Sequence, residues 1–185
     1  KMIYLKFISR LIRFFKSLLT YNQLSNHKFQ NKNQVTNANI VLNLLKNKNF
    51  YPNYIVDVGC GYGEWTKKLL KIFPQSIFYL YDADKNNFEK LNFLKNKNEN
   101  INFKICLLSD DNKSYKFYNM GYGSSIFEEQ TSHNRNIEEI LSTTLDQELP
   151  VELKNQSNNL IKLDVQGSEM KILKGLKNTI NSFEV

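Results

Sequence analysis

A glycine-rich turn follows an apolar, strand-like run near residue 55 and precedes a helix-like stretch. The turn reads Asp57-Val58-Gly59-Cys60-Gly61-Tyr62-Gly63, between residues 54–56 and residues 64–73. Glycines at a strand-to-helix junction let backbone N–H groups and the helix N-terminus approach a ligand closely. The next strand-like run, residues 76–81, ends at Asp82. A carboxylate about 20 residues beyond such glycines can accept hydrogen bonds from both ribose hydroxyls, so the two features predict a nucleoside-cofactor site.

The spacing of the glycines indicates which cofactor fits. Dinucleotide enzymes generally have G-x-G-x-x-G, whereas this chain has G-x-G-x-G with Asp57 two positions before the first glycine. A pyrophosphate beside Asp57 would face a like charge, whereas a sulfonium cofactor with an amino-acid tail and no phosphate would not. The segment therefore resembles motif I of the class I S-adenosylmethionine-dependent methyltransferases. The alternative is a nicotinamide-dependent dehydrogenase or epimerase.

The expected cofactor contacts come from the turn and from the ends of the second and third predicted strands. They are Asp57, Gly59, Gly61, Gly63, Asp82, Ser109 and Asp110. The glycines would let the backbone meet the methionine portion, Asp57 would favour its ammonium directly or through water, and Asp82 would hold the ribose. Ser109 and Asp110 fall where this class places its adenine contacts. Asp110 could accept from the exocyclic amine, or it could be a plain turn residue.

Three further residues are candidates for the acceptor side. Asp164 ends a predicted strand, and ligands of open α/β sheets bind outside the carboxyl ends of the strands. It could remove or orient the proton of a hydroxyl acceptor, or it could only hydrogen-bond the following turn. Ser124 and Asp146 are candidate substrate contacts. Their alternatives are a mobile loop for Ser124 and a helix cap for Asp146.

Short apolar strands alternate with helices over residues 54–177, which predicts a Rossmann-like α/β fold with a mostly parallel sheet and helices on both faces. The predicted strands are residues 54–58, 77–81, 102–107 and 159–164, and the predicted helices are residues 64–73, 85–95 and 168–177. Between the third and fourth strands, residues 114–118 alternate like a strand and residues 121–125 form a flexible loop. This insertion could form a lid. Residues 183–185 look like a further strand cut short, so we expect that C-terminal strands are missing.

Downstream of the turn, the chain resembles the FkbM family of methyltransferases in three stretches. They are residues 81–91, residues 144–146 and residues 161–175. The first looks like the family's acidic strand end and following helix, the second matches its T-L-D element, and the third resembles its K-I-D-V-E/Q-G-x-E stretch. The resemblance spans about residues 53–185.

The chain departs from the family pattern at two places. The family more often has Glu-Pro where this chain has Asp82-Ala83, and its D-x-G-A-N-x-G differs here at Cys60 and Gly61. The resemblance implies an S-adenosylmethionine-dependent methyltransferase that acts on oxygen atoms, often sugar hydroxyls of glycans or lipid-linked saccharides. A non-catalytic, membrane-attached binding module is the alternative outside the enzymes.

The net charge of +7 is unevenly distributed along the 185 residues. Residues 1–56 contain nine Lys or Arg and no acidic residue, which leaves 16 basic and 18 acidic side chains in residues 57–185. The predicted catalytic part therefore lacks the positive charge that nucleic-acid enzymes concentrate around their clefts, and we expect no nucleic-acid partner. Cys60 and Cys106 have no metal-ligand spacing, so reduced thiols in a cytoplasmic protein without a metal are expected.

The N-terminal segment is predicted to be separate from the catalytic domain. Residues 2–20 place basic residues at intervals of three and four opposite an apolar face, which is typical of an amphipathic helix. Such a helix could lie at the inner face of a membrane, or it could pack on protein. Residues 21–35 are polar and lack periodicity, so we divide the chain into a helix and linker over residues 1–35 and a methyltransferase domain over residues 36–185.

Overall fold

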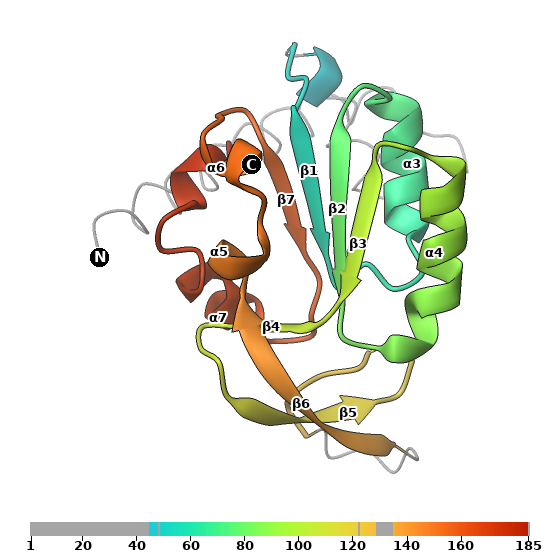
Figure 1. The fold of residues 1–185 in the computed structure, drawn as a ribbon, viewed down its shortest axis with the longest axis vertical. Helices are drawn as coiled ribbons and strands as arrows, with labels where there is room; N and C mark the ends of the chain where they lie inside the picture. Colours follow the sequence, from blue (N-terminus) through green and yellow to red (C-terminus); the bar gives the residue numbers. More distant parts are fainter. Residues whose placement is uncertain (1–44, 48, 122, 129–134, 185) are drawn as a thin grey trace, which may run out of the picture.

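The computed structural model describes residues 45–47, 49–121, 123–128 and 135–184. The predicted amphipathic helix and linker lie outside these residues. Among the residues that the structure describes, no helix is both long enough and apolar enough to cross a membrane. The described part is an α/β fold built around one parallel sheet (Figure 1).

The central sheet has four parallel strands in the order β3-β2-β1-β7. They are β1 (Tyr54–Val58), β2 (Ile77–Asp82), β3 (Ile101–Ile105) and β7 (Leu160–Leu163). All five residues of β1 are buried, as expected for a central strand covered on both faces. Because β1 lies between β2 and β7, the carboxyl ends of these three strands meet at one edge of the sheet.

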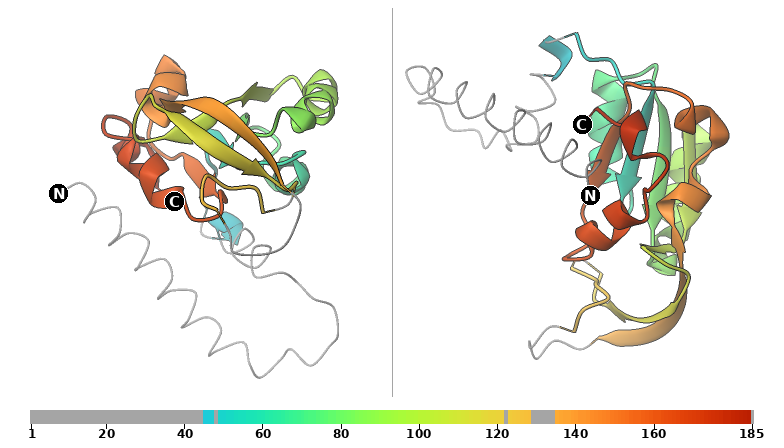
Figure 2. Two further views of the ribbon diagram at one scale, coloured as in Figure 1. Left: turned by 90° about the horizontal axis from the view of Figure 1, so that it is seen from below. Right: turned by 90° about the vertical axis from the view of Figure 1, so that its left-hand side faces the viewer.

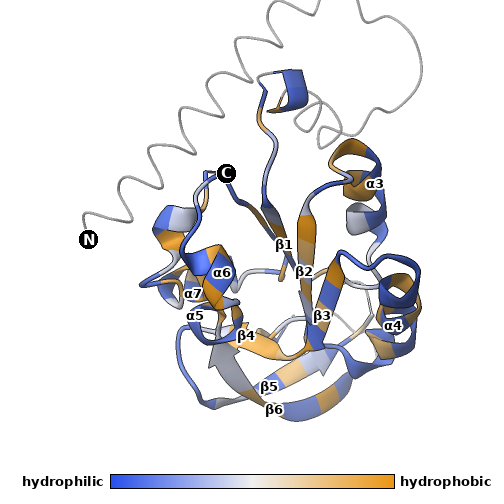
Figure 3. Cartoon of the chain, turned by 45° about the horizontal axis from the view of Figure 1, so that its top comes forward, coloured by the Kyte–Doolittle hydropathy of each residue, from blue (hydrophilic) through white to orange (hydrophobic). Residues whose placement is uncertain are grey.

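Helices cover the two faces of this sheet separately (Figures 1 and 3). On one face, α3 (Glu64–Ile72), η1 (Lys85–Asn87) and α4 (Phe88–Lys97) follow β1 and β2, and Leu69 and Leu91 pack with Ile55 and Leu80. On the other face lie α5 (Leu145–Glu148), α6 (Val151–Lys154), α7 (Glu169–Lys174) and η2 (Ile180–Ser182), whose apolar side chains pack against Val56 and Val58. The predicted Rossmann-like fold is therefore confirmed.

A second, smaller sheet crosses the carboxyl edge of the first, below it in Figure 1 and in profile in Figure 2. Its strands are β4 (Leu107–Ser109), β5 (Ser114–Asn119) and β6 (Asn136–Thr144), in the order β4-β6-β5. β5 and β6 pair antiparallel, and β4 joins β6 in parallel. The insertion that the sequence predicts is thus a hairpin whose loop lies beside the ends of the main strands.

Two predicted elements differ from the structure by more than a small shift of their ends. The strand expected over residues 102–107 is divided: β3 ends at Ile105, the Cys106 N–H donates to the Asp82 carbonyl (2.8 Å), and the chain then joins β6 as β4. The helix expected over residues 168–177 ends at Lys174, and the following Gly175 packs against the Ser109 carbonyl, where a Cβ atom would lie 2.4 Å away. Phe183, expected to begin a further strand, forms a parallel bridge with Asn159.

Candidate functional site

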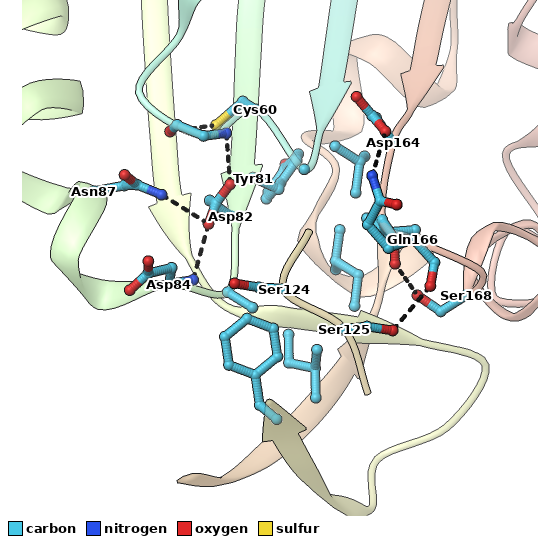
Figure 4. Close-up of a pocket in the computed structure, with 18 of the residues that line it drawn as sticks. Cys60, Tyr81, Asp82, Asp84, Asn87, Ser124, Ser125, Asp164, Gln166 and Ser168 are labelled. Atoms are coloured by element: carbon cyan, nitrogen blue, oxygen red, sulfur yellow. Dashed lines mark hydrogen bonds between the residues drawn. The ribbon is translucent and has the colours of Figure 1, made fainter. Parts of the chain in front are cut away.

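A cavity of about 310 Å³ opens at the carboxyl ends of β1, β2 and β7. Figure 4 shows Asp82 on one side, Asp164 and Gln166 on the other, and Ser124 and Ser125 below them. The β5–β6 loop supplies part of the wall from Gly121 to Ile126. The volume lies at the lower end of the range for small-molecule sites, and the position is where open α/β sheets bind ligands.

The glycine bend forms the part of the wall nearest to Asp82. The Gly59 and Cys60 N–H groups donate to the Tyr81 carbonyl (2.9 and 3.2 Å), which ties the bend to the end of β2. The Gly61 N–H donates to Asp82 Oδ2 over 2.6 Å. A Cβ atom on Gly61 would meet nothing within 4 Å, so this glycine borders open space. Asp82 and the bend therefore lie together in the cavity wall, which is the arrangement that the sequence predicts.

Asp82 is a partly buried carboxylate held by three donors. Its Oδ1 accepts from the Asp84 N–H (2.9 Å) and from Asn87 Nδ2 (3.2 Å), while Oδ2 accepts from Gly61. Burial raises the pKa of Asp82, and hydrogen bonds from Asp84, Gly61 and Asn87 oppose that effect. Because each carboxylate oxygen has two lone pairs, Oδ2 keeps capacity for one further donor. Asp82 can therefore receive a ligand hydroxyl without losing its own contacts.

Asp57 lies behind the cavity wall. Its side chain is fully buried, and its oxygens accept from Thr66 Oγ1 (2.7 Å) and from Lys162 Nζ (2.9 Å). Asp57 and Lys162 are register partners on β1 and β7, so both side chains project from the same face of the sheet. Lys162 lines the cavity and Asp57 does not. The structure thus places a protein cation where the sequence analysis expects a ligand ammonium.

The turn after β7 forms the opposite wall. Asp164 is 58% exposed, and its Oδ1 accepts from Gln166 Nε2 over 3.2 Å. Gln166 has φ +52°, a left-handed conformation that costs free energy in a residue with a side chain. Ser125 Oγ donates to the Gln166 carbonyl (2.9 Å), which fastens the hairpin loop to this turn. The strained turn therefore holds Asp164 at the cavity and anchors the loop that covers it.

Glu169 stabilises the same turn from the start of α7. Burial acts to raise the pKa of Glu169, but backbone hydrogen bonds, including those from Gly167 and Val165, lower it overall. The carboxylate is thus held as an anion that organises the turn. Glu169 does not line the cavity.

The remaining predicted site residues lie partly in the cavity lining and partly outside it. Gly63 lies outside the lining and faces Leu94 of the core, which a Cβ atom on this glycine would approach to 2.6 Å. Ser124 lines the cavity, but its hydroxyl is engaged within the loop, where it accepts from the Met120 N–H (3.0 Å) and donates to the Gly121 carbonyl (2.8 Å). Ser109 and Asp110 lie outside the lining. Ser109 is fully buried, and Asp110 is within 3.5 Å of Lys171 Nζ.

Asp146 is also remote from the cavity lining. It accepts from the Asn178 N–H (2.8 Å) and the Thr179 N–H (3.1 Å), so it fastens the segment between α7 and η2. The helix that it was expected to cap is instead capped by Thr144 in a capping box with Gln147. Asp146 thus has a structural partner in this conformation.

The site also contains residues that the sequence analysis did not select. Lys162, Gln166, Asp84 and Asn87 all line the cavity. Lys162 precedes Asp164 by two positions, and side chains at that spacing leave a strand on the same face, so this lysine could have been found. Gln166 gave no such signal, because its left-handed backbone becomes evident only in the folded turn.

The charge of the cavity is predominantly negative. Among the described residues that line it, four are acidic and one is a lysine. They are Glu64, Asp82, Asp84 and Asp164, with Lys162 as the cation. This lining favours a ligand with net positive charge and opposes a polyanionic one.

The fold agrees with the comparison against known families. The Methyltransferase FkbM domain matches residues 28–185, which begins upstream of the motifs described above and includes every strand of the structure. No curated protein matches the chain. Because the domain covers most of the sequence, the protein belongs to the FkbM family of methyltransferases.

Proposed function

We propose that this protein uses S-adenosylmethionine to methylate a hydroxyl oxygen of a saccharide, a glycolipid or a related small molecule. The observation that carries the proposal is the contact between Asp82 and the Gly61 N–H in the cavity wall. It brings a partly buried carboxylate, with capacity for a ribose hydroxyl, next to the open space at Gly61. Membership in the FkbM methyltransferases supports the same reaction class.

The charges of the cavity fit this cofactor better than a dinucleotide. S-adenosylmethionine carries a sulfonium, an ammonium and one carboxylate, so its net charge is positive. Four carboxylates and one ammonium line the described wall, and Asp57 offsets the charge of that ammonium from behind. A pyrophosphate would meet repulsion from these acidic groups. The lining therefore supports a methyl donor and disfavours a nicotinamide dinucleotide.

Each wall of the cavity has a distinct task in this proposal. The bend at Gly59–Gly63 and Asp82 would hold the donor, whose sulfonium supplies an electrophilic methyl carbon when it is bound. The hairpin loop, fastened by Ser125 to Gln166, would exclude water and position the acceptor. Positioning of this kind accounts for much of the catalysis available to a direct displacement.

Asp164 is the residue that we assign to the acceptor hydroxyl. A neutral alcohol is a weak nucleophile, so loss or orientation of its proton matters more than it does for an amine. Asp164 lies at the cavity, and Gln166 Nε2 holds one of its oxygens while Lys162 Nζ lies 3.7 Å from the other. Its exposure leaves it accessible to an acceptor that enters the cavity.

Calorimetry on the complete chain tests the cofactor assignment. S-adenosylhomocysteine should bind with micromolar affinity and NAD should not, because the wall repels a pyrophosphate. NAD binding without S-adenosylhomocysteine binding would support a dehydrogenase, and binding of neither would support a non-catalytic module. Radiolabel transfer from S-adenosylmethionine to a panel of saccharides, with the Asp164→Asn variant as a control, then tests the reaction.

A further inference from the structure

Lys162 occupies an unusual position between a buried acid and the cavity. Its side chain is 21% exposed, whereas Asp57 behind it is fully buried. Nζ donates to Asp57 Oδ1 (2.9 Å) and to the Gly59 carbonyl (3.2 Å). These two contacts hold the ammonium beside the start of the glycine bend. An ammonium has three N–H donors, so one is left over.

Within the described part of the chain the third donor has no hydrogen bond, and Nζ lies 5.6 Å from the centroid of the Trp65 ring, which also lines the cavity. Asp164 Oδ2 lies 3.7 Å from Nζ, which is an ion-pair distance but beyond hydrogen-bonding range. Lys162 is also the one cation among the described residues of a wall that carries four carboxylates. A ligand carboxylate that enters this cavity is therefore repelled by most of the wall and attracted at Lys162.

We propose that Lys162 binds the carboxylate of the methyl donor's amino-acid tail through its remaining N–H. This inference rests on the proposed function and assigns a determinant of donor specificity to β7. Asp57 acts on the donor through Lys162, since it holds the ammonium in place and does not itself reach the cavity. The lysine thereby distinguishes a donor with a complete amino-acid tail from adenosyl compounds that lack its carboxylate.

A competing explanation is that Lys162 only neutralises the buried Asp57. Removing the lysine alone would leave Asp57 as an uncompensated buried charge and could prevent folding. The test therefore uses the paired variant Asp57→Asn/Lys162→Gln, in which both charges are removed together. Lys162→Arg, which retains the positive charge, is the matched control. Circular dichroism and thermal unfolding establish that each variant is folded.

The probes are S-adenosylhomocysteine and its decarboxylated analogue, with affinities measured by calorimetry. Loss of the carboxylate should weaken binding to the wild-type chain by about tenfold or more, as expected for a charge-assisted hydrogen bond. In the paired variant, loss of the carboxylate should weaken binding by less than about threefold. The single variant Lys162→Arg, which keeps the positive charge, should retain most of the wild-type preference for the probe with the carboxylate. Equal penalties in wild type and the paired variant, or no penalty in wild type, would overturn the proposal.

A second measurement needs no variant. Reductive methylation of the wild-type chain, followed by peptide mass spectrometry, reports how accessible the Lys162 ammonium is. Saturating S-adenosylhomocysteine should protect Lys162 more than the saturating decarboxylated analogue does, whereas equal protection contradicts the assignment. If the wild-type chain binds neither probe, the proposed function itself fails. If it binds both probes with equal affinity, only the role of Lys162 fails.

Discussion

The two glycine-bearing segments of the cavity wall have the same backbone conformation for different reasons. Gly59 has φ +68° and Gly121 has φ +72°. A Cβ atom on Gly59 would lie 2.0 Å from the Asp164 carbonyl oxygen, whereas one on Gly121 would meet nothing within 4 Å. Gly59 is thus required by close packing between the ends of β1 and β7 as well as by its backbone conformation, whereas Gly121 is required by its backbone conformation alone. The glycine bend is consequently packed against the end of β7, while the hairpin loop can change without disturbing it.

Gly59→Ala should have the largest effect because it breaks both constraints at once. The new methyl group would overlap the Asp164 carbonyl, and alanine would have to adopt a left-handed φ. We expect a loss of roughly 3 kcal/mol or more in the free energy of unfolding, measured by urea denaturation. Failure to accumulate folded protein would be the extreme form of the same result.

Gly121→Ala is the matched control because its backbone angle is nearly the same. With open space around the new methyl group, the expected loss is about 1 to 2 kcal/mol, which is the cost of the left-handed conformation alone. Comparable losses of unfolding free energy in Gly59→Ala and Gly121→Ala would show that the close packing of Gly59 against β7 adds nothing to the cost of its backbone conformation.

Asp82→Asn should have the next largest effect, and it acts on donor binding. An amide has one acceptor oxygen in place of two, so it cannot satisfy Gly61, Asp84 and Asn87 and also receive a ligand hydroxyl. We expect a loss of about tenfold or more in S-adenosylhomocysteine affinity by calorimetry. Asp110→Asn, which changes a carboxylate outside the cavity, should alter the affinity by less than about twofold. A loss in Asp110→Asn equal to that in Asp82→Asn would restore the adenine role that the sequence suggests.

The pH dependence of binding provides a smaller and more specific test of Asp82. Burial raises its pKa despite the hydrogen bonds that it accepts. A raised pKa means that this carboxyl takes up a proton at a higher pH than an ordinary aspartate, whose pKa is about 4. S-adenosylhomocysteine affinity should therefore be constant near neutrality and decline as the pH falls through the raised pKa of Asp82. The decline should be absent from Asp82→Asn, and its persistence there would assign the titration to another group.

The sequence located the glycine bend and Asp82 because their signals are local. A buried strand, alternating glycines and a helix define the bend, and parallel pairing of the next strand necessarily brings Asp82 to the same edge. The contact between Asp82 and Gly61 follows from these two elements alone. The three-residue spacing of Thr144 and Gln147 also predicts a capping box, whereas a cap by Asp146 was the alternative to its role as a substrate contact.

The rest of the site depends on long-range register, which a single sequence does not reveal. Asp57 pairs with Lys162 only because β1 and β7 are neighbours in one particular register. Asp146 contacts Thr179 across 33 positions, and no local pattern reports that contact. Ser109 lies in β4, which leaves the main sheet to join β6, so a residue expected near the adenine is buried instead. These differences arise from where the chain changes sheets.

Ser125→Ala should have the most local effect on the structure, and it tests whether the Ser125 side chain is the main attachment of the hairpin loop to the β7 turn. The substitution removes the hydrogen bond to the Gln166 carbonyl and the one that Ser125 Oγ accepts from the Phe127 N–H (3.1 Å), and it leaves the antiparallel bridge to Tyr118 in place. The expected loss of global stability is about 1 to 2 kcal/mol, close to the net value of two hydrogen bonds. Hydrogen exchange should nevertheless increase at the amides of residues 123–127 and stay unchanged in β1, because the bend does not depend on the loop. Faster exchange in β1 as well would mean that the acceptor wall supports the donor wall, contrary to the independence inferred from their glycines.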